Sequence, residues 1–230
     1  MTKKIGVVIF PGSNCDHDVI YAIENIFQKE AVKLWHKDTE LKSCDFIILP
    51  GGFSYGDYLR SGAIARFSPI MEVIIEYANN GGLLMGICNG FQILCEAKLL
   101  PGALLHNTNR QFICKNVLIK AYQNKSYATK DIPTGKVLKI PIAHGEGRYY
   151  IDEKGLNDMK INNQILFTYC NENGIEDDES NPNGSLSNIA GICNQRGNVI
   201  GMMPHPERAV DELLANTDGK FIFDSIFNSL

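Results

Sequence analysis

The chain has 230 residues, of which 44% are hydrophobic and 21% are charged, and its formal net charge is −4. This composition fits one large α/β domain or two small ones, and it offers neither a basic footprint for nucleic acid nor an apolar run of membrane-spanning length. The seven scattered cysteines, the absence of a signal peptide and the lack of metal-ligand spacings predict reduced thiols in a cytoplasmic protein that binds no metal.

The first part of the chain alternates continuous apolar runs with helical stripes. We predict strands at 5–10, 32–35 and 46–49 and helices at 19–27 and 69–77. Apolar runs of this kind mark strands that are covered on both faces. The strand–helix–strand order therefore predicts an open parallel sheet with right-handed crossovers.

A glycine-rich loop, Pro50-Gly51-Gly52-Phe53-Ser54-Tyr55-Gly56-Asp57, follows the third strand. It lies where α/β sheets bind ligands, at the carboxyl ends of the strands. Asp57 stands where a Walker loop needs lysine, so we reject nucleotide binding there. Two interpretations remain: the glycines bring backbone N–H groups close to a small ligand, or the segment is a plain turn.

The segment 82–92 is predicted to form a buried strand, a sharp turn with Cys88 at its apex, and the start of a helix. Within it, Gly86-Ile87-Cys88-Asn89-Gly90 has the Gly-x-Nuc-x-Gly pattern of a nucleophile elbow, with sulfur in place of a serine hydroxyl. Flanking glycines allow the strand and the helix to approach closely. The helix N-terminus favours the thiolate. The alternative is that Cys88 is a small core residue.

From 112 to 150 the pattern changes to strands joined by loops, which predicts antiparallel pairs added to the parallel core. Within this region, His144-Gly145-Glu146-Gly147 holds polar groups between glycines just after a strand. The segment either forms the wall of a cleft or is a polar turn in which the hydrogen-bonding groups of His144 have partners. We favour an orienting role for His144 over a chemical one.

In the last part of the chain, 165–170 is predicted as a strand, and 189–193 with 198–203 as a hairpin. The acidic, Asn-rich segment 171–187 is predicted to be a long exposed loop, either mobile or in contact with a partner, and a purely solvated loop is favoured. The tail at 218–227 is predicted as an amphipathic helix with Phe221, Ile222, Ser225 and Ile226 on one face.

A cysteine nucleophile needs a base, and a histidine serves best when a third group orients it. In Pro204-His205-Pro206-Glu207 the prolines fix the backbone. In extended geometry, residues two apart point the same way, so the Glu207 carboxylate can lie beside the His205 ring. The alternative is an ordinary core or surface histidine.

Acyl transfer also needs donors for a developing oxyanion. The N–H of Asn89, directly after Cys88, is one candidate, and a backbone N–H from Gly51-Gly52-Phe53 is the second. Gln92 lies one helical turn after Cys88 on the same face, so we expect it to reach a substrate amide.

These motifs, in this order, resemble those of the class I (triad) glutamine amidotransferases. More narrowly, the chain is similar to the amidotransferase subunits of phosphoribosylformylglycinamidine synthase. The segments that carry the narrower resemblance are Gly51 to Arg60, Phe10 to Asp16, His144 to Gly147, Asn181 to Ser185 and Gly201 to Arg208. The resemblance implies a single domain over 1–230 with a flavodoxin-like α/β fold, helices on both faces of the sheet and an antiparallel extension.

The resemblance also implies a site and a reaction. Cys88, His205 and Glu207 are expected to form a catalytic triad that hydrolyses L-glutamine to glutamate and ammonia. Gly52 and Asn89 are expected to hold the oxyanion. Gly51, Phe53, Gln92 and His144 are expected to shape the glutamine pocket.

By the same resemblance, ammonia passes to a large synthetase subunit that converts formylglycinamide ribonucleotide to the amidine. ATP and Mg²⁺ are expected on that subunit and no cofactor in this chain, and a small bridging subunit is expected as a third component.

Three other functions are weighed. The first is another enzyme on the same fold, either an amidotransferase subunit for another synthetase or a stand-alone cysteine hydrolase. The second is a non-enzymatic binding module, which the presence of Cys88, His205 and Glu207 disfavours. The third is a redox sensor that acts through Cys88. We interpret oxidation of Cys88 as a vulnerability rather than a purpose.

Overall fold

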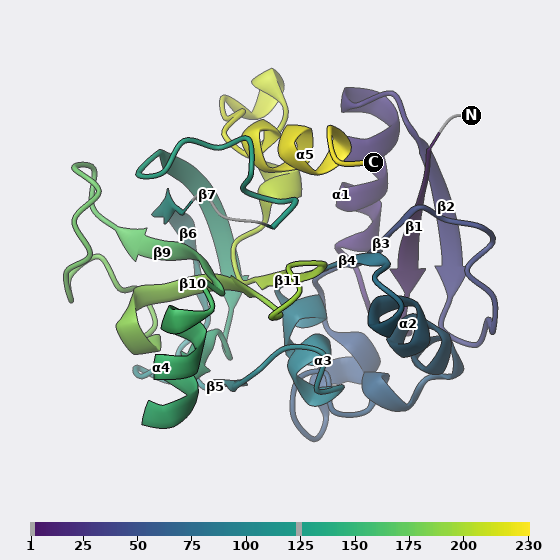
Figure 1. Ribbon diagram of the computed structural model, residues 1–230, viewed down its shortest axis with the longest axis horizontal. Helices are drawn as coiled ribbons and strands as arrows, with labels where there is room; N and C mark the ends of the chain where they lie inside the picture. Colours follow the sequence, from purple (N-terminus) through teal and green to yellow (C-terminus); the bar gives the residue numbers. More distant parts are fainter. Residues whose placement is uncertain (1–2, 123–125) are drawn as a thin grey trace.

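The computed structural model describes residues 3–122 and 126–230, which build a central sheet of nine strands (Figure 1). Five neighbouring strands are parallel, in the order β2 (Glu30–Trp35), β1 (Lys4–Ile9), β3 (Phe46–Leu49), β4 (Leu83–Ile87) and β11 (Val199–Met202). The sheet continues with antiparallel neighbours, in the order β10 (Ile189–Cys193), β9 (Ile165–Cys170), β6 (Ile113–Ala121) and β7 (Val137–His144). The predicted parallel sheet with an antiparallel extension is confirmed.

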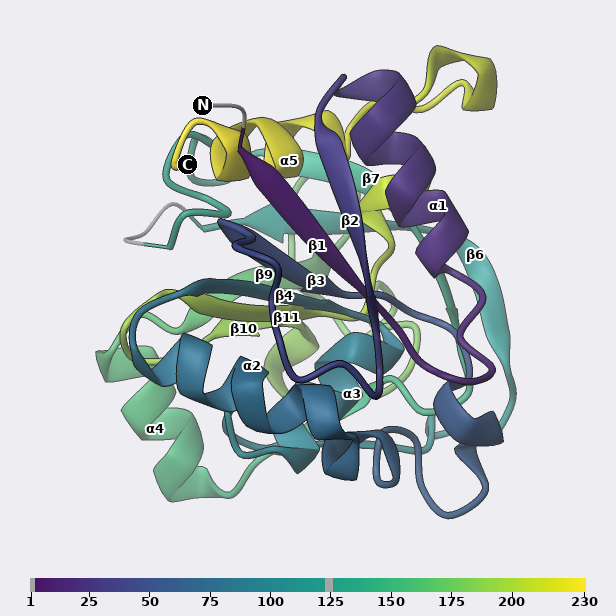
Figure 2. The ribbon, with the colours of Figure 1, turned by 90° about the vertical axis from the view of Figure 1, so that its right-hand side faces the viewer.

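Helices cover both faces of the parallel half of the sheet. One face carries α1 (Asp16–Tyr21), which continues as a π-helical turn over Ala22–Ile26, and α5 (Lys220–Phe227). The other face carries α2 (Pro69–Asn79) and α3 (Asn89–Glu96), as Figures 1 and 2 both show. All four residues of β3 are buried because helices cover it on both sides, which accounts for its uninterrupted apolar sequence.

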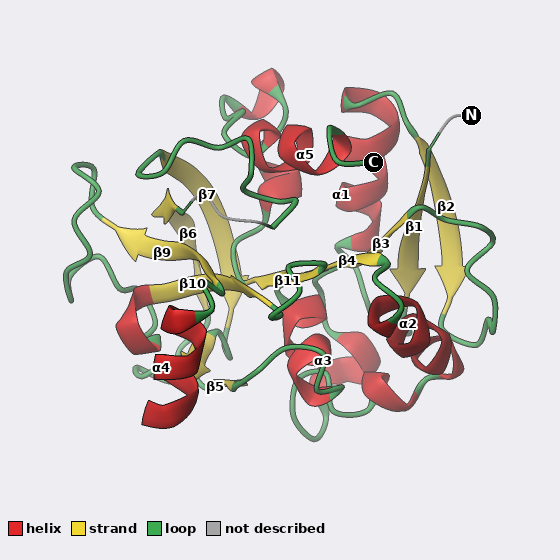
Figure 3. Ribbon diagram, viewed as in Figure 1, coloured by secondary structure: helices red, strands yellow, loops and turns green. Residues whose placement is uncertain are grey.

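Two elements are absent from the sequence predictions (Figure 3). Helix α4 (Glu153–Ile161) begins after Asp152, whose carboxylate accepts a hydrogen bond from the Gly155 N–H at 2.7 Å. Its buried residue is Met159, so it lacks the apolar stripe that identifies a helix from sequence. Strand β5 (Ala103–Leu105) pairs with β8 (Arg148–Tyr150) in a separate two-stranded sheet. Strand β8 thus belongs to the region 112–150 that was predicted to hold antiparallel pairs, but it pairs outside the nine-stranded sheet.

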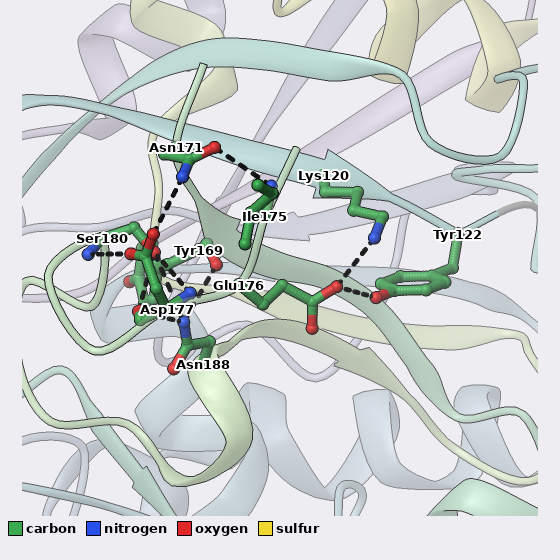
Figure 4. A network of polar contacts seen from close by, with 9 residues as sticks. All are labelled: Lys120, Tyr122, Tyr169, Asn171, Ile175, Glu176, Asp177, Ser180 and Asn188. Atoms are coloured by element: carbon green, nitrogen blue, oxygen red, sulfur yellow. Dashed lines mark hydrogen bonds and ion pairs between the residues drawn. The ribbon is translucent and has the colours of Figure 1, made fainter. Parts of the chain in front are cut away.

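The segment 171–187 is a mostly exposed loop, as predicted, but it is not purely solvated, because some of its polar groups bond to other parts of the chain (Figure 4). The Asn188 amide donates to the carbonyl oxygens of Tyr169 and Asp177, at 3.2 and 2.9 Å. The Glu176 carboxylate accepts hydrogen bonds from Lys120 and Tyr122 on the neighbouring part of the sheet. Side-chain amides thus satisfy backbone groups, which allows a polar segment to pack against the protein.

The C-terminal helix is confirmed, but its buried face differs from the predicted one. Phe223 is fully buried with Ile222, Ser225 and Ile226, whereas Phe221 is 41% exposed. In residues 3–122 and 126–230, no helix has both the length and the apolar character needed to cross a membrane.

Candidate active site

Cys88 stands in the tight turn between β4 and α3. Its φ is 50° and its ψ is −105°, a backbone conformation that is strained for any residue other than glycine. Its N–H donates to the Met202 carbonyl at 2.8 Å, which ties the turn to the end of the adjacent strand β11. The predicted strand, turn and helix are all present.

The flanking glycines are required by close packing. A Cβ on Gly90 would lie 1.9 Å from the carbonyl oxygen of Leu49 at the end of β3, and one on Gly86 would lie 2.6 Å from the Gly90 backbone. Helix α3 can therefore pack against β3 and β4 at this distance only with glycine at both positions.

His205 and Glu207 form a buried pair just after β11. The His205 Nδ1 and Glu207 Oε1 atoms are 2.6 Å apart, and the two residues are 1% and 3% exposed. The predicted contact exists, but its predicted geometry is wrong. Glu207 lies in a 3₁₀ turn over Pro206–Arg208 rather than in an extended segment, and this turn brings the carboxylate to the ring.

The charge state of His205 follows from its neighbours. Burial alone would lower the pKa of His205, but the Glu207 carboxylate and the Cys88 sulfur outweigh burial and raise this pKa above its usual value. His205 Nε2 is buried without a hydrogen-bond partner among the described residues.

Gly51 leaves room for the thiol and the imidazole to meet. A Cβ on Gly51 would lie 2.7 Å from His205 Cε1 and 3.3 Å from Cys88 Cβ. The two side chains, from elements more than 100 residues apart, thus flank one point at the carboxyl edge of the sheet. Gly51 itself is not among the residues that line the cavity that opens beside these two side chains.

A cavity of about 210 Å³ opens beside Cys88 and His205. Of the predicted pocket residues, Gly52, Phe53, Gln92 and His144 line it. Gly52 has a φ of +116°, and a Cβ there would lie 2.7 Å from the Asn14 backbone nitrogen, so this turn needs glycine. The Asn89 N–H belongs to the first turn of α3, where N–H groups have no intrahelical acceptor.

Gln92 and His144 are held in place by neighbouring polar groups. Gln92 Nε2 donates to the Glu146 carbonyl at 2.6 Å, and its Oε1 accepts from Asn89 Nδ2 at 2.9 Å. His144 Nδ1 and Asn107 Oδ1 are 3.2 Å apart. Burial, with a smaller effect from His205, lowers the pKa of His144 to about 4, so its ring is neutral at pH 7. The orienting role of His144 stays a prediction.

Nine residues of the cavity wall were not among the predicted site residues. They are Asn14, Cys15, Asp57, Ser61, Phe112, Ala143, Gly145, Glu146 and Arg208. Asp57 and Glu146 lie inside motifs that the sequence analysis identified, so their positions carried a signal. Phe112 stacks on Phe53, with ring centroids 6.3 Å apart, and only the folded chain brings these two rings together.

Comparison with known proteins decides the family. A family model described as the CobB/CobQ-like glutamine amidotransferase domain matches residues 2–221. The chain belongs to this family. It is 51% identical over 228 residues to "Phosphoribosylformylglycinamidine synthase subunit PurQ" of Salinibacter ruber, covering 99% of this chain and 97% of that protein.

Solved structures have the same fold as this chain. A chain of "Structure of PurLQS from Thermotoga maritima" is 44% identical, with a TM-score of 0.86, and the match covers 100% of this chain and 99% of that one. Another glutamine amidotransferase from Thermotoga maritima is 13% identical with a TM-score of 0.57, over 100% and 92% of the two chains, and shows the fold alone.

Proposed function

We propose that this amidotransferase is the glutaminase subunit of phosphoribosylformylglycinamidine synthase and supplies ammonia for purine biosynthesis. The observation that carries the chemistry is the buried His205–Glu207 pair beside Cys88 at the elbow. The full-length similarity to subunits that bear the synthase name supports the narrower assignment.

The residues support the following reaction. The Cys88 thiolate attacks the side-chain carboxamide carbon of glutamine, and the N–H groups of Gly52 and Asn89 stabilise the oxyanion. His205, oriented by Glu207, protonates the departing ammonia. Water then cleaves the glutamyl thioester, which releases glutamate and restores the thiol. The balance is glutamine and water to glutamate and ammonia.

The partners and the compartment belong to the same proposal. Ammonia passes to a synthetase subunit that uses ATP and Mg²⁺ to convert formylglycinamide ribonucleotide to the amidine, and a small bridging subunit completes the complex. The PurLQS name of the solved relative supports three components. A cytoplasmic location is expected because the mechanism requires a reduced Cys88 thiol and the cytoplasm keeps thiols reduced.

Cys88→Ala tests the division of labour. In the assembled complex, this substitution is expected to abolish glutamine-dependent amidine synthesis, because no nucleophile remains, and to leave synthesis from added ammonium within about twofold of wild type. Glu72→Gln, on the exposed face of α2, is the control. Loss of both activities in Cys88→Ala would contradict the proposal.

A further inference from the structure

The glycine-rich loop that carries the Gly52 N–H ends in a strained turn. Tyr55, Gly56 and Asp57 have φ values of 56°, 71° and 52°. Glycine adopts this left-handed region at little cost, but Tyr55 and Asp57 are held there against their backbone preference. Strained backbone of this kind persists only where the surrounding contacts fix it. The contacts of Tyr55 therefore help to decide where the loop lies.

The Tyr55 side chain reaches from the loop to two buried polar groups. Its hydroxyl lies 2.7 Å from His36 Nδ1 and 2.8 Å from Ser68 Oγ. His36 directly follows β2 and Ser68 directly precedes α2, and the two residues are 6% and 3% exposed. The rings of His36 and Tyr55 also meet edge to face, with centroids 5.5 Å apart. One hydroxyl thus links the loop to β2 and α2.

Ser68 makes this contact in place of a helix cap. It occupies the N-cap position of α2, where a serine side chain ordinarily accepts a hydrogen bond from the first helical turn. The Ser68 side chain makes no such bond and lies against the Tyr55 hydroxyl instead. Burial, and then the Lys37 charge, lower the pKa of His36, so its ring is neutral at pH 7 and can accept a hydrogen bond. The Tyr55 hydroxyl can therefore donate to one partner and accept from the other.

The opposite side of the loop is tied to the nucleophile turn. The Ser54 N–H donates to Asn89 Oδ1 at 3.2 Å, and Asn89 Nδ2 donates to Asp57 Oδ1 at 3.2 Å. Asn89 is also the residue whose N–H is the second oxyanion donor in the proposed reaction. The loop thus lies between two anchors, Asn89 on the side of the nucleophile and the Tyr55 hydroxyl on the far side. A shift of the loop would separate the two proposed donors.

We propose that Tyr55 is a positioning residue for the glutaminase reaction. Its hydroxyl, held by His36 and Ser68, keeps the strained loop where the Gly52 N–H meets the oxyanion. The inference rests on the proposed function and adds a residue that does not line the cavity beside Cys88. The Gly52 N–H acts when negative charge develops on the carboxamide oxygen. Loss of the hydroxyl therefore lowers kcat and leaves KM nearly unchanged.

The test is Tyr55→Phe, which removes the hydroxyl and keeps the ring. Tyr77→Phe is the matched control, because the Tyr77 hydroxyl donates to the Asp45 carbonyl at 2.8 Å, just before β3 and at the opposite end of that strand from the loop. Ser68→Ala removes one partner of the Tyr55 hydroxyl without removing a helix cap. Two rates are measured in the assembled synthase complex: glutamate release from glutamine, and alkylation of Cys88 by iodoacetamide, followed by peptide mass spectrometry.

We expect Tyr55→Phe to lower kcat for glutamate release about tenfold or more, with KM within about twofold of wild type. Alkylation of Cys88 should stay within about twofold, because a thiolate attacks iodoacetamide without forming an oxyanion. Ser68→Ala should lower kcat by a smaller factor, and the double variant should be no slower than Tyr55→Phe, because both changes act on one link. Tyr77→Phe should leave both rates within about twofold of wild type.

An unchanged kcat in Tyr55→Phe would overturn the inference. Equal losses of glutamate release and of alkylation would also overturn it, because they would indicate a general change of structure, and so would an equal loss of kcat in Tyr77→Phe. If Tyr55→Phe does not assemble into the complex, the same criteria apply to Ser68→Ala. Failure of wild type to release glutamate would instead overturn the proposed function, and this inference with it.

Discussion

The His205 ring lies between the Glu207 carboxylate and the Cys88 thiol, and all three groups are buried. A carboxylate at one ring nitrogen fixes the ring orientation and stabilises the imidazolium. The other ring nitrogen, Nε2, has no hydrogen-bond partner in the part of the chain that the structure describes. In the proposed reaction, this pair holds the proton that moves to and from the Cys88 sulfur.

Glu207→Gln is expected to lower the pKa of His205 by about one unit or more, because the amide removes the main interaction that raises it. Since the pKa of the folded state is raised, His205 stabilises the fold fully below about pH 6.5, and this stabilisation is lost as pH rises through the raised value. NMR of the histidine ring protons against pH measures the shift. An unchanged His205 titration, as expected for the Glu72→Gln control, would contradict the role of Glu207.

Gly147 is expected to be essential for the position of His144. A Cβ at Gly147 would lie 2.2 Å from His144 Cε1, so Gly147→Ala must displace the ring, lower the free energy of unfolding by about 1–3 kcal/mol and reduce glutamine turnover. Gly145→Ala is the matched control, since its Cβ would meet only the Phe112 ring, at 3.9 Å. Urea unfolding and glutamate release measure the two effects. Equal effects of the two substitutions would show that the ring contact is unimportant.

At the scale of elements, the segment 171–188 supports the wall of the active site. Asn183 in this segment is fully buried, donates to the Gly147 carbonyl at 2.9 Å and accepts from the Ser185 N–H at 3.0 Å. The segment is thereby tied to the glycine against which His144 packs. The sequence of this segment is polar and suggests exposure to solvent, but Asn183 within it is buried and bonded to the site.

Asn183→Ala should lower the free energy of unfolding by about 1–3 kcal/mol, because it removes the hydrogen bonds of a fully buried amide to the Gly147 carbonyl and the Ser185 N–H. Asn173→Ala, at an exposed position of the same segment, should change stability by less than about 0.5 kcal/mol. Chemical denaturation of the full chain compares the two. A stable Asn183→Ala protein would mean that the segment is held by other contacts.

The elements that could be predicted are those with strong local patterns. Strands β3 and β4 are short apolar runs, and the turn at Cys88 is marked by two glycines. Helix α4 could not be found, because most of its surface is exposed, and β5 could not, because its pairing with β8 depends on residues about 45 positions away. The same holds for the site: motifs identify Cys88 and His205, whereas Phe112 and Arg208 enter the cavity only through the fold.

At the scale of the whole molecule, the sheet topology gathers the site at one edge. Parallel strands β3, β4 and β11 end side by side, and the glycine-rich loop, the Cys88 turn and the His205 segment follow them. His144 reaches the same edge at the end of β7, from the antiparallel part of the sheet. The antiparallel extension therefore supplies one wall of the candidate site, and the proposed reacting groups, Cys88 and His205, follow strands of the parallel half.

This arrangement brings the groups of the proposed glutaminase reaction to one edge of the sheet. The central claim is that a glutaminase serves a separate synthetase. Its most direct test is glutamate release from glutamine by the purified chain, alone and then with the synthetase and bridging subunits, ATP, Mg²⁺ and formylglycinamide ribonucleotide. We predict weak release alone and a strong rise with the full mixture. Strong release that the partners do not change would contradict the claim, and no release under either condition would remove Cys88 from the role of nucleophile.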